Sequence, residues 1–160
     1  FVSTTFAGET TALAAAKVVI ETLQRTEALA TLHLQGQALG EGLCGAFARH
    51  GLPVTLWGNA ARMQVRWQDV PQVATSQQLR TLWMAEMARR GILWGLGVCF
   101  PMTCWTSAET QKIVQAAEDV CGLIAQALAT ERVQDALPCP VIEDVLPARY
   151  PPESKDLCAY

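Results

Sequence analysis

The spacing of apolar residues constrains this chain more than any other feature. Through most of its 160 residues, apolar side chains recur every three or four positions, which predicts helices with one buried face. Between residues 54 and 67 the period changes to two, as expected for strands. Because the two periods occupy separate blocks, we predict an α+β fold.

Four main helices follow from the apolar pattern and its boundary residues. They are predicted at residues 8–26, at 27–49, from Thr75 or Ser76 to Arg90, and from an N-cap at Ser107 to about 128. Strands are predicted at residues 54–57, 63–67 and 92–94. Gly51 and Gly91 supply the stops of the second and third helices. The order predicts four helices packed on one face of a small, mainly antiparallel three-stranded sheet.

Several side chains carry specific packing expectations. The first helix is predicted to bury one stripe, formed by Leu13, Ala16, Val19, Ile20 and Leu23. Gly36 and Gly40 weaken the second helix, so they are predicted to permit close packing against a neighbour. Trp57 and Trp67 alternate with polar residues and are predicted to face the sheet core.

Composition bounds the number of domains and the class of partner. With 51% hydrophobic and 17% charged residues, a chain of this length forms one domain with a real core. Prolines become frequent from residue 138 onward. We therefore predict a domain over residues 1–128, followed by an extended tail or docking arm over residues 129–160.

Charge and cysteine pattern exclude several function classes. The net charge of −3 and the scattered basic residues predict no nucleic-acid partner. No membrane association is predicted either, because no apolar run approaches the roughly 20 residues that span a bilayer. The six cysteines form no C-x-x-C pair, and neither histidine lies at a ligand spacing from them, so no metal site is predicted. Free thiols in a reducing cytoplasm are the expected state.

A hydroxyl cluster precedes the first helix. Ser3, Thr4 and Thr5 are followed by Gly8 and then by the helical run. Small residues beside free N–H groups at a helix start suit an oxyanion, which the helix dipole also favours. On spacing alone, an ordinary N-cap is the favoured explanation of the same residues, because serine and threonine are preferred there.

The segment Thr5-Phe6-Ala7-Gly8-Glu9-Thr10 resembles the T-F-x-G-[E/N] segment of class III, fold-type I aminotransferases. The nearest group is the glutamate-1-semialdehyde aminomutase-like enzymes, which use pyridoxal phosphate. The resemblance implies that this segment opens the C-terminal small domain. It also implies that the Thr5 hydroxyl and the Phe6 N–H bind the cofactor phosphate of the neighbouring subunit in a homodimer. The likeness extends more loosely to about Leu128.

The same resemblance places the catalytic machinery outside this chain. In the family, the lysine that binds the cofactor lies upstream of the threonine segment, and Lys17, Lys112 and Lys155 do not match it. We therefore expect no catalytic residue here, no activity without an N-terminal large domain, and an amino-acid or amino-ketone substrate for the whole enzyme. The start at Phe1, without methionine, is expected for a piece of a longer protein.

The stretch from Ile92 to Ser107 aligns with the family segment that approaches the substrate. No arginine lies between Ile92 and Thr106, and Trp105 stands where many relatives carry a histidine. The residues of this stretch therefore do not identify the substrate. Four residues form either an apolar wall for a substrate or ordinary packing: Trp94, Phe100, Met102 and Trp105.

One alternative comes from a different functional class. The chain would then be a free-standing, non-catalytic α+β interaction module, with its proline-rich tail as a docking arm. In the aminotransferase interpretation, apolar faces once covered by the large domain are left exposed, and self-association is expected.

Overall fold

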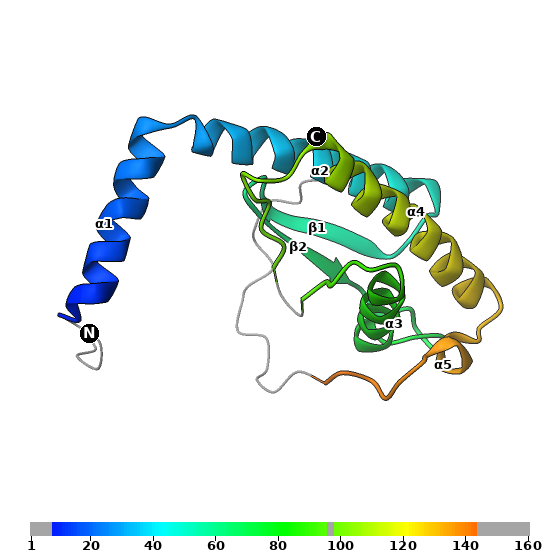
Figure 1. The fold of residues 1–160 in the computed structure, drawn as a ribbon. Helices are drawn as coiled ribbons and strands as arrows, with labels where there is room; N and C mark the ends of the chain where they lie inside the picture. Colours follow the sequence, from blue (N-terminus) through cyan, green and yellow to red (C-terminus); the bar gives the residue numbers. More distant parts are fainter. Residues whose placement is uncertain (1–7, 96–97, 144–160) are drawn as a thin grey trace.

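The computed structural model describes residues 8–95 and 98–143. Figure 1 shows the arrangement of its elements. In these residues the elements are α1 (Thr10–Arg25), α2 (Ala28–Arg49), β1 (Val54–Asn59), β2 (Arg62–Trp67), α3 (Ser76–Arg89), α4 (Ser107–Ala129) and α5 (Val133–Ala136). The α+β class and the four main helices are confirmed.

The strands β1 and β2 form an antiparallel hairpin. Val54 lies opposite Trp67 at the open end, and Asn59 lies opposite Arg62 beside the turn. The turn is closed by Asn59, whose side-chain oxygen accepts a hydrogen bond from the Ala61 N–H at 3.0 Å. Alternate side chains turn toward the helices, as the period of two predicts, and the buried ones are Leu56, Met63, Val65 and Trp67.

The third strand predicted at residues 92–94 does not form, and in the described part of the chain the sheet has two strands. The Ile92 N–H donates to the Met87 carbonyl at 3.0 Å, which closes the end of α3 and leaves this group unavailable to a sheet. Cys99 instead forms a single antiparallel bridge with Met63 on β2. The two backbone hydrogen bonds of this bridge measure 2.7 and 3.1 Å.

The buried side chains of the hairpin share one face, and α2 and α3 pack on that face as predicted, whereas α1 does not contact the sheet. Helices α2 and α3 contact the hairpin, and α4 packs against α2 and α3 (Figure 1). Thr75 caps α3, with a reciprocal hydrogen bond from the Gln78 side chain. The N-cap of α4 is Thr106, not Ser107, because Thr106 forms the same capping box with Glu109.

Three helices end in the same way, with one residue in the left-handed region. Gly51 (φ +58°) follows α2 and Gly91 (φ +76°) follows α3, as the sequence predicts. Glu131 (φ +56°) takes this place after α4, and its N–H and that of Arg132 bond back to Leu128 and Ala127. Since no glycine marks this end, the sequence carries no signal for it.

The core is built around four aromatic side chains. Phe47 from α2, Trp67 from β2, Trp83 from α3 and Trp94 from the following loop have neighbouring ring centroids 5.6–6.3 Å apart. Trp67 faces this core as predicted. Trp57 does not: it is half-buried on the opposite face of the hairpin, where the Arg66 guanidinium lies 4.1 Å from its ring centroid.

Helix α1 forms where the sequence predicts it, but the predicted burial of its stripe is wrong. None of its residues is buried, and Leu13, Val19 and Ile20 are each more than half exposed. In Figure 1, α1 stands away from the packed body and meets it only near the start of α2. Periodicity predicts that a helix has an apolar face, but it does not predict what covers that face.

Packed structure continues beyond Ala129. Val133 in α5 is completely buried, and α5 contacts α3 and α4. Further along, the Arg80 guanidinium donates to the Ile142 carbonyl at 2.7 Å, and the Ile142 N–H donates to the Thr81 hydroxyl at 2.9 Å. The division at residue 128 stays a prediction, and residues 144–160 lie outside the described part.

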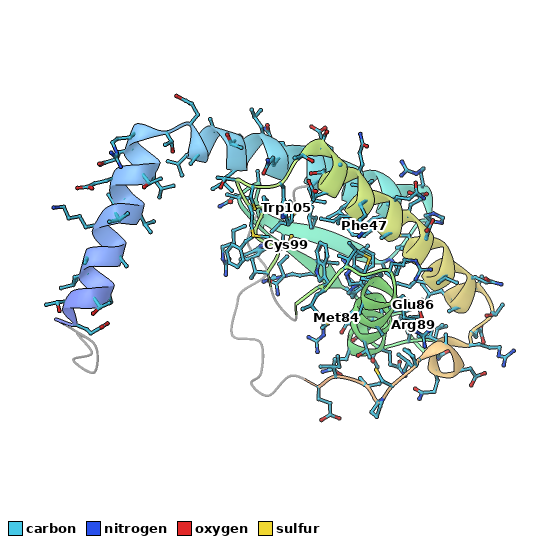
Figure 2. All side chains as sticks on the ribbon, viewed as in Figure 1. Phe47, Met84, Glu86, Arg89, Cys99 and Trp105 are labelled. Carbon is cyan, nitrogen blue, oxygen red and sulfur yellow. The ribbon has the colours of Figure 1, made fainter. Side chains whose placement is uncertain are left out.

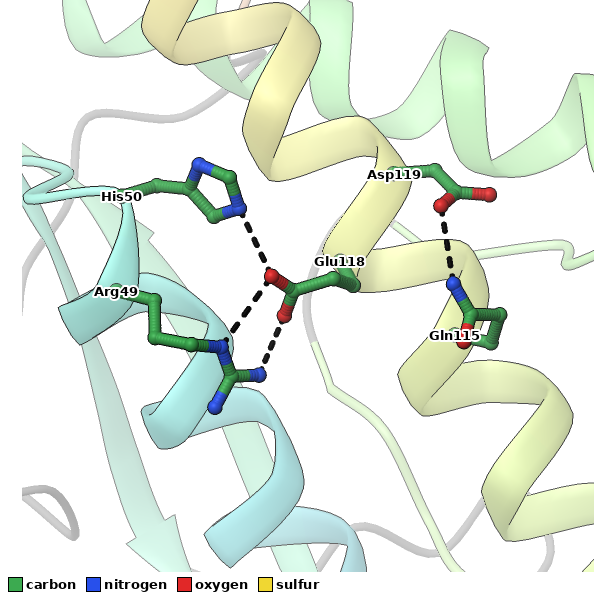
Figure 3. A network of polar contacts seen from close by, with 5 residues as sticks. All are labelled: Arg49, His50, Gln115, Glu118 and Asp119. Carbon is green, nitrogen blue, oxygen red and sulfur yellow. Dashed lines mark hydrogen bonds and ion pairs between the residues drawn. The ribbon is translucent and has the colours of Figure 1, made fainter.

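A charged network ties the end of α2 to the middle of α4. Figure 3 shows the Glu118 carboxylate between Arg49 and His50. Two guanidinium nitrogens of Arg49 donate to the two carboxylate oxygens of Glu118. His50 Nε2 lies 2.9 Å from one of these oxygens, Oε1. The hydrogen bond from Arg49, followed by that from His50, holds the pKa of Glu118 below its usual value of 4.5.

We expect this network to make part of the stability depend on pH. Because the folded-state pKa of Glu118 is lowered, its contribution is complete above 4.5 and is lost as the pH falls through the lower folded value. Glu118→Gln should lower the free energy of unfolding at neutral pH by up to about 1 kcal/mol, the range of exposed ion pairs. Urea unfolding across the acid range measures this difference, which should vanish in acid.

Asp119→Asn is the matched control for that experiment. It removes the same charge from the neighbouring position of α4 but leaves the contact between Arg49 and Glu118 intact. If the free energy of unfolding changes with pH in the same way in both variants, a specific role for Glu118 is contradicted.

Gly36 is required where α2 crosses the hairpin turn. A Cβ atom at Gly36 would lie 1.8 Å from the carbonyl oxygen of Ala60, whereas one at Gly40 would lie 3.6 Å from Leu56 Cδ2, an ordinary contact. The prediction of close packing is therefore confirmed for Gly36 but not for Gly40.

Alanine at these two positions should have opposite effects. Gly36→Ala should lower the free energy of unfolding by about 1–3 kcal/mol because the backbones must separate. Gly40→Ala gains helix propensity without a clash and should stabilise by up to about 1 kcal/mol. Thermal and urea unfolding of both variants measures the difference; equal effects would contradict the close approach at Gly36.

Candidate functional site

The first candidate site is the start of α1. Thr5 and Phe6, the predicted phosphate-binding residues, lie outside the described residues. The described part begins with Gly8, which has φ +97° and nothing within 4 Å of a hypothetical Cβ. Glu9 is the N-cap residue, and its side chain makes no capping hydrogen bond. Among the described residues, no side chain caps the first-turn N–H groups, an arrangement that suits an anion.

The second candidate site is a pocket of about 360 Å³ between the end of α3 and the start of α4. Cys99 and Trp105, labelled in Figure 2, both line it. Most of its lining is apolar, and the described lining residues are Gly91, Ile92, Leu93, Trp94, Gly95, Val98, Cys99, Phe100, Met102, Trp105, Glu109, Lys112 and Ile113.

Three hydrogen-bonded contacts fix the loop that forms this pocket. The bridge between Cys99 and Met63 attaches the loop to β2. The Trp105 N–H donates to the Met102 carbonyl at 3.0 Å, which makes a turn. Gln35 on α2 donates through Nε2 to the Trp105 carbonyl at 2.7 Å and so holds the turn against α2. Sequence reasoning missed Gln35, because a glutamine on a helix carries no signal for a partner 70 residues away.

The four residues predicted as either a substrate wall or packing divide between these roles. Trp94 is buried and packs edge-on against Trp83, so it belongs to the core as well as to the base of the pocket. Phe100 is 58% exposed and Met102 is 50% exposed, and both line the pocket. Trp105 is half-buried between these environments.

Two charged residues from the first turns of α4 complete the pocket. The Glu109 carboxylate accepts hydrogen bonds from the Thr106 hydroxyl and N–H, both at 2.6 Å, and these lower its pKa. Glu109 is therefore ionised and acts as a helix cap. Lys112 supplies a positive charge beside it.

The thiol in the pocket wall is not a nucleophile at neutral pH. Burial raises the pKa of Cys99 to about 11, and it raises that of Cys121 in the core to about 12. Only a thiolate attacks or binds a metal readily. The described pocket residues can therefore hold an apolar group and exclude water from it, with Lys112 and Glu109 at the charged side.

Alkylation tests this description of the thiols. The prediction of free thiols is wrong for Cys44, which is disulfide-bonded. Cys99, Cys104, Cys121 and Cys139 are free, and of these Cys104 and Cys139 are exposed. With iodoacetamide at neutral pH, Cys104 and Cys139 should react at least about tenfold faster than Cys99 and Cys121. Peptide mass spectrometry over time measures the order, and rapid labelling of Cys99 would contradict a buried, neutral thiol.

Other charged groups in the described residues act in packing. Glu86 is only 7% exposed and accepts hydrogen bonds from Arg89 at 2.5 Å and Arg90 at 2.8 Å. Lys17 pairs with Glu21 on the exposed surface of α1, and Lys155 lies outside the described residues. No buried lysine suited to a covalent cofactor bond occurs in the part that the structure describes.

Residues 8–95 and 98–143 contain neither a metal-ligating cluster nor a helix that could cross a membrane. No three His, Cys, Asp or Glu side chains lie close enough together there to hold a metal ion. None of the helices in this part of the chain combines the length and apolar character needed to cross a bilayer.

Comparison with known proteins places the fold. No protein-family model and no curated protein sequence matches the chain. Among solved structures, the chain is similar to the FumI protein of Sphingopyxis sp. MTA144 in its pyridoxal-phosphate internal aldimine form, with a TM-score of 0.59 and 23% identity. It is also similar to a transaminase with pyridoxal phosphate bound, with a TM-score of 0.59 and 17% identity.

The two likenesses cover most of this chain but little of its neighbours. They include 67% and 72% of this chain, which spans only 25% and 27% of the two solved chains. At these identities the likeness concerns the fold. The chain thus shares the fold of one part of each of these two solved structures.

Proposed function

We propose that this chain is the C-terminal small domain of a pyridoxal-phosphate-dependent aminotransferase or aminomutase. Within that class we place it in class III, near the glutamate-1-semialdehyde aminomutase-like enzymes. The observation that carries the proposal is the transaminase fold, preceded by the Thr5-Phe6-Ala7-Gly8-Glu9 segment at the start of α1.

The start of α1 fits the phosphate of this cofactor. Gly8 has a positive φ and open space around it, so a ligand can approach the backbone. The first helical turn offers uncapped N–H groups and the positive end of the dipole. The Thr5 hydroxyl and the Phe6 N–H would add charge-assisted hydrogen bonds of about 1.5–3 kcal/mol each.

These contacts assist a cofactor that is anchored elsewhere. When bound, pyridoxal phosphate serves as an electron sink for amino-group chemistry. In this proposal the lysine that holds it belongs to a large domain outside this chain, and Thr5 reaches the cofactor of the partner subunit in a homodimer. Two hydrogen bonds do not retain the cofactor alone, so the isolated chain should bind it weakly and be inactive.

The pocket beside α4 would form part of the substrate entrance. Its exposed apolar residues, Phe100 and Met102, favour an uncharged portion of an amino-acid or amino-ketone substrate. No arginine is available along the loop from Ile92 to Thr106 to bind a substrate carboxylate. Lys112 is the cation that the described pocket offers for that purpose.

Thr5→Ala in the full-length enzyme tests the phosphate contact. Loss of one charge-assisted hydrogen bond should weaken cofactor retention by about tenfold or more while the fold stays intact. Cofactor release on dialysis, followed by absorbance, measures the effect, and circular dichroism monitors the fold.

Thr4→Ala is the matched control, because it removes the neighbouring hydroxyl one position away. Unchanged cofactor affinity in Thr5→Ala would remove Thr5 from the site. A reading frame that starts at Phe1 would instead favour the interaction module.

A further inference from the structure

Cys44 on α2 differs from the other described cysteines because it forms a disulfide. Its side chain is half-buried and packs against the core. The chain has six cysteines, and those at positions 99, 104, 121 and 139 are free thiols. A disulfide within one chain joins two of its own cysteines, and after these five Cys158 is the one that remains. The partner of Cys44 therefore follows by elimination, although Cys158 itself lies outside the described residues.

Cys44 lies on the side of α2 that faces away from α4. A Cβ atom at Gly42 would collide with the Val114 side chain, so Gly42 marks the side of α2 that packs on α4. Two residues further along an α-helix, the direction has turned by about 200°. A segment that approaches Cys44 therefore does not have to pass between α2 and α4.

The end of the described chain is fixed to α3. Ile142 is held there by its hydrogen bonds with the Arg80 guanidinium and the Thr81 hydroxyl, and Thr81 is completely buried. From Ile142 to Cys158 the chain advances 16 residues, which span up to about 53–58 Å when extended. A globular chain of 160 residues has a radius of gyration of about 15 Å. A segment of this length can therefore cross a face of the body from α3 to α2.

We propose that Cys44 and Cys158 form a disulfide that fastens the C-terminal segment to α2. With Ile142 held on α3 and Cys158 held on α2, residues 143–157 are attached to the body at both ends. In this state the proline-rich segment is a strap and not a free docking arm. The inference is independent of the proposed function, because it uses no cofactor contact and no second subunit.

Thiol–disulfide exchange with a small-molecule disulfide, such as oxidised glutathione, closes this bond. One protein thiolate attacks the small disulfide, forms a mixed disulfide and releases one small thiol. The second protein thiolate attacks the protein sulfur of the mixed disulfide and releases the other small thiol. Two protein thiols are oxidised to one disulfide, and the small disulfide takes up the two electrons and two protons to become two thiols. Excess reduced glutathione reverses both steps and opens the strap.

Peptide mapping of the full-length protein tests the pairing. The protein is incubated with oxidised glutathione, its remaining thiols are blocked with iodoacetamide in denaturant, and it is digested with trypsin without reduction. Cleavage after Arg25, Arg49 and Lys155 places Cys44 in the peptide 26–49 and Cys158 in the peptide 156–160. Mass spectrometry should find these two peptides joined, and reduction should separate them. A Cys44 that is alkylated, bound to glutathione or joined to a different cysteine would overturn the proposal.

Two serine variants separate the specific bond from general thiol reactivity. Cys158→Ser removes the partner, so Cys44 should be recovered as a thiol or as its glutathione adduct. Cys139→Ser is the matched control, because it removes an exposed, free thiol from the same end of the chain and should leave the joined peptides unchanged. A Cys44 that is still joined to another protein cysteine in Cys158→Ser, or that loses its partner in Cys139→Ser, contradicts the assignment.

Limited proteolysis tests whether the bond acts as a strap. Arg149 lies between the two attachment points, so opening the bond with reduced glutathione should speed native-state tryptic cleavage after Arg149 at least about tenfold. In Cys158→Ser, cleavage should be fast with either form of glutathione, and circular dichroism verifies that the fold is the same in both states. Equal cleavage rates in the oxidised and reduced wild-type protein would show that the disulfide does not hold this segment.

Discussion

The packing of four aromatic rings holds the structure together, since each ring comes from a different segment. Phe47, Trp67, Trp83 and Trp94 join α2, the hairpin, α3 and the pocket loop through edge-to-face and tilted contacts. Trp94 also forms the base of the pocket. The pocket is thus an extension of the core, and its shape depends on the same ring contacts that fix α3 against the hairpin.

Much of the fold was predictable from local patterns. The helix stops at Gly51 and Gly91 and the hairpin rest on residue chemistry within a few positions, and all were confirmed. The failures share one cause, which is that local patterns do not specify tertiary partners. The Ile92 N–H donates to a carbonyl at the end of α3 instead of to a strand. The apolar stripe of α1 is not buried by any described part of the chain.

The candidate site was predictable only in part, for the same reason. The apolar residues of the pocket could be identified as a group from the sequence. Only the structure shows that Trp94 is buried in the core, whereas Phe100 and Met102 are exposed. Gln35 could not be found, because its role depends on a contact across 70 positions. The resemblance at Thr5 and Phe6 implies a part of a pyridoxal-phosphate enzyme, and the likeness to solved structures agrees with it at the level of the fold.

The backbone bridge between Cys99 and Met63 has a consequence for solubility. A hairpin of two strands leaves each outer edge open, and an unpaired edge can recruit strands from other molecules. Here Cys99 occupies hydrogen-bonding groups of Met63 on the outer edge of β2. The loop that shapes the pocket therefore also covers this position of the edge, so a sequence change that frees the loop would expose Met63 to pairing with another strand as well as deform the cavity.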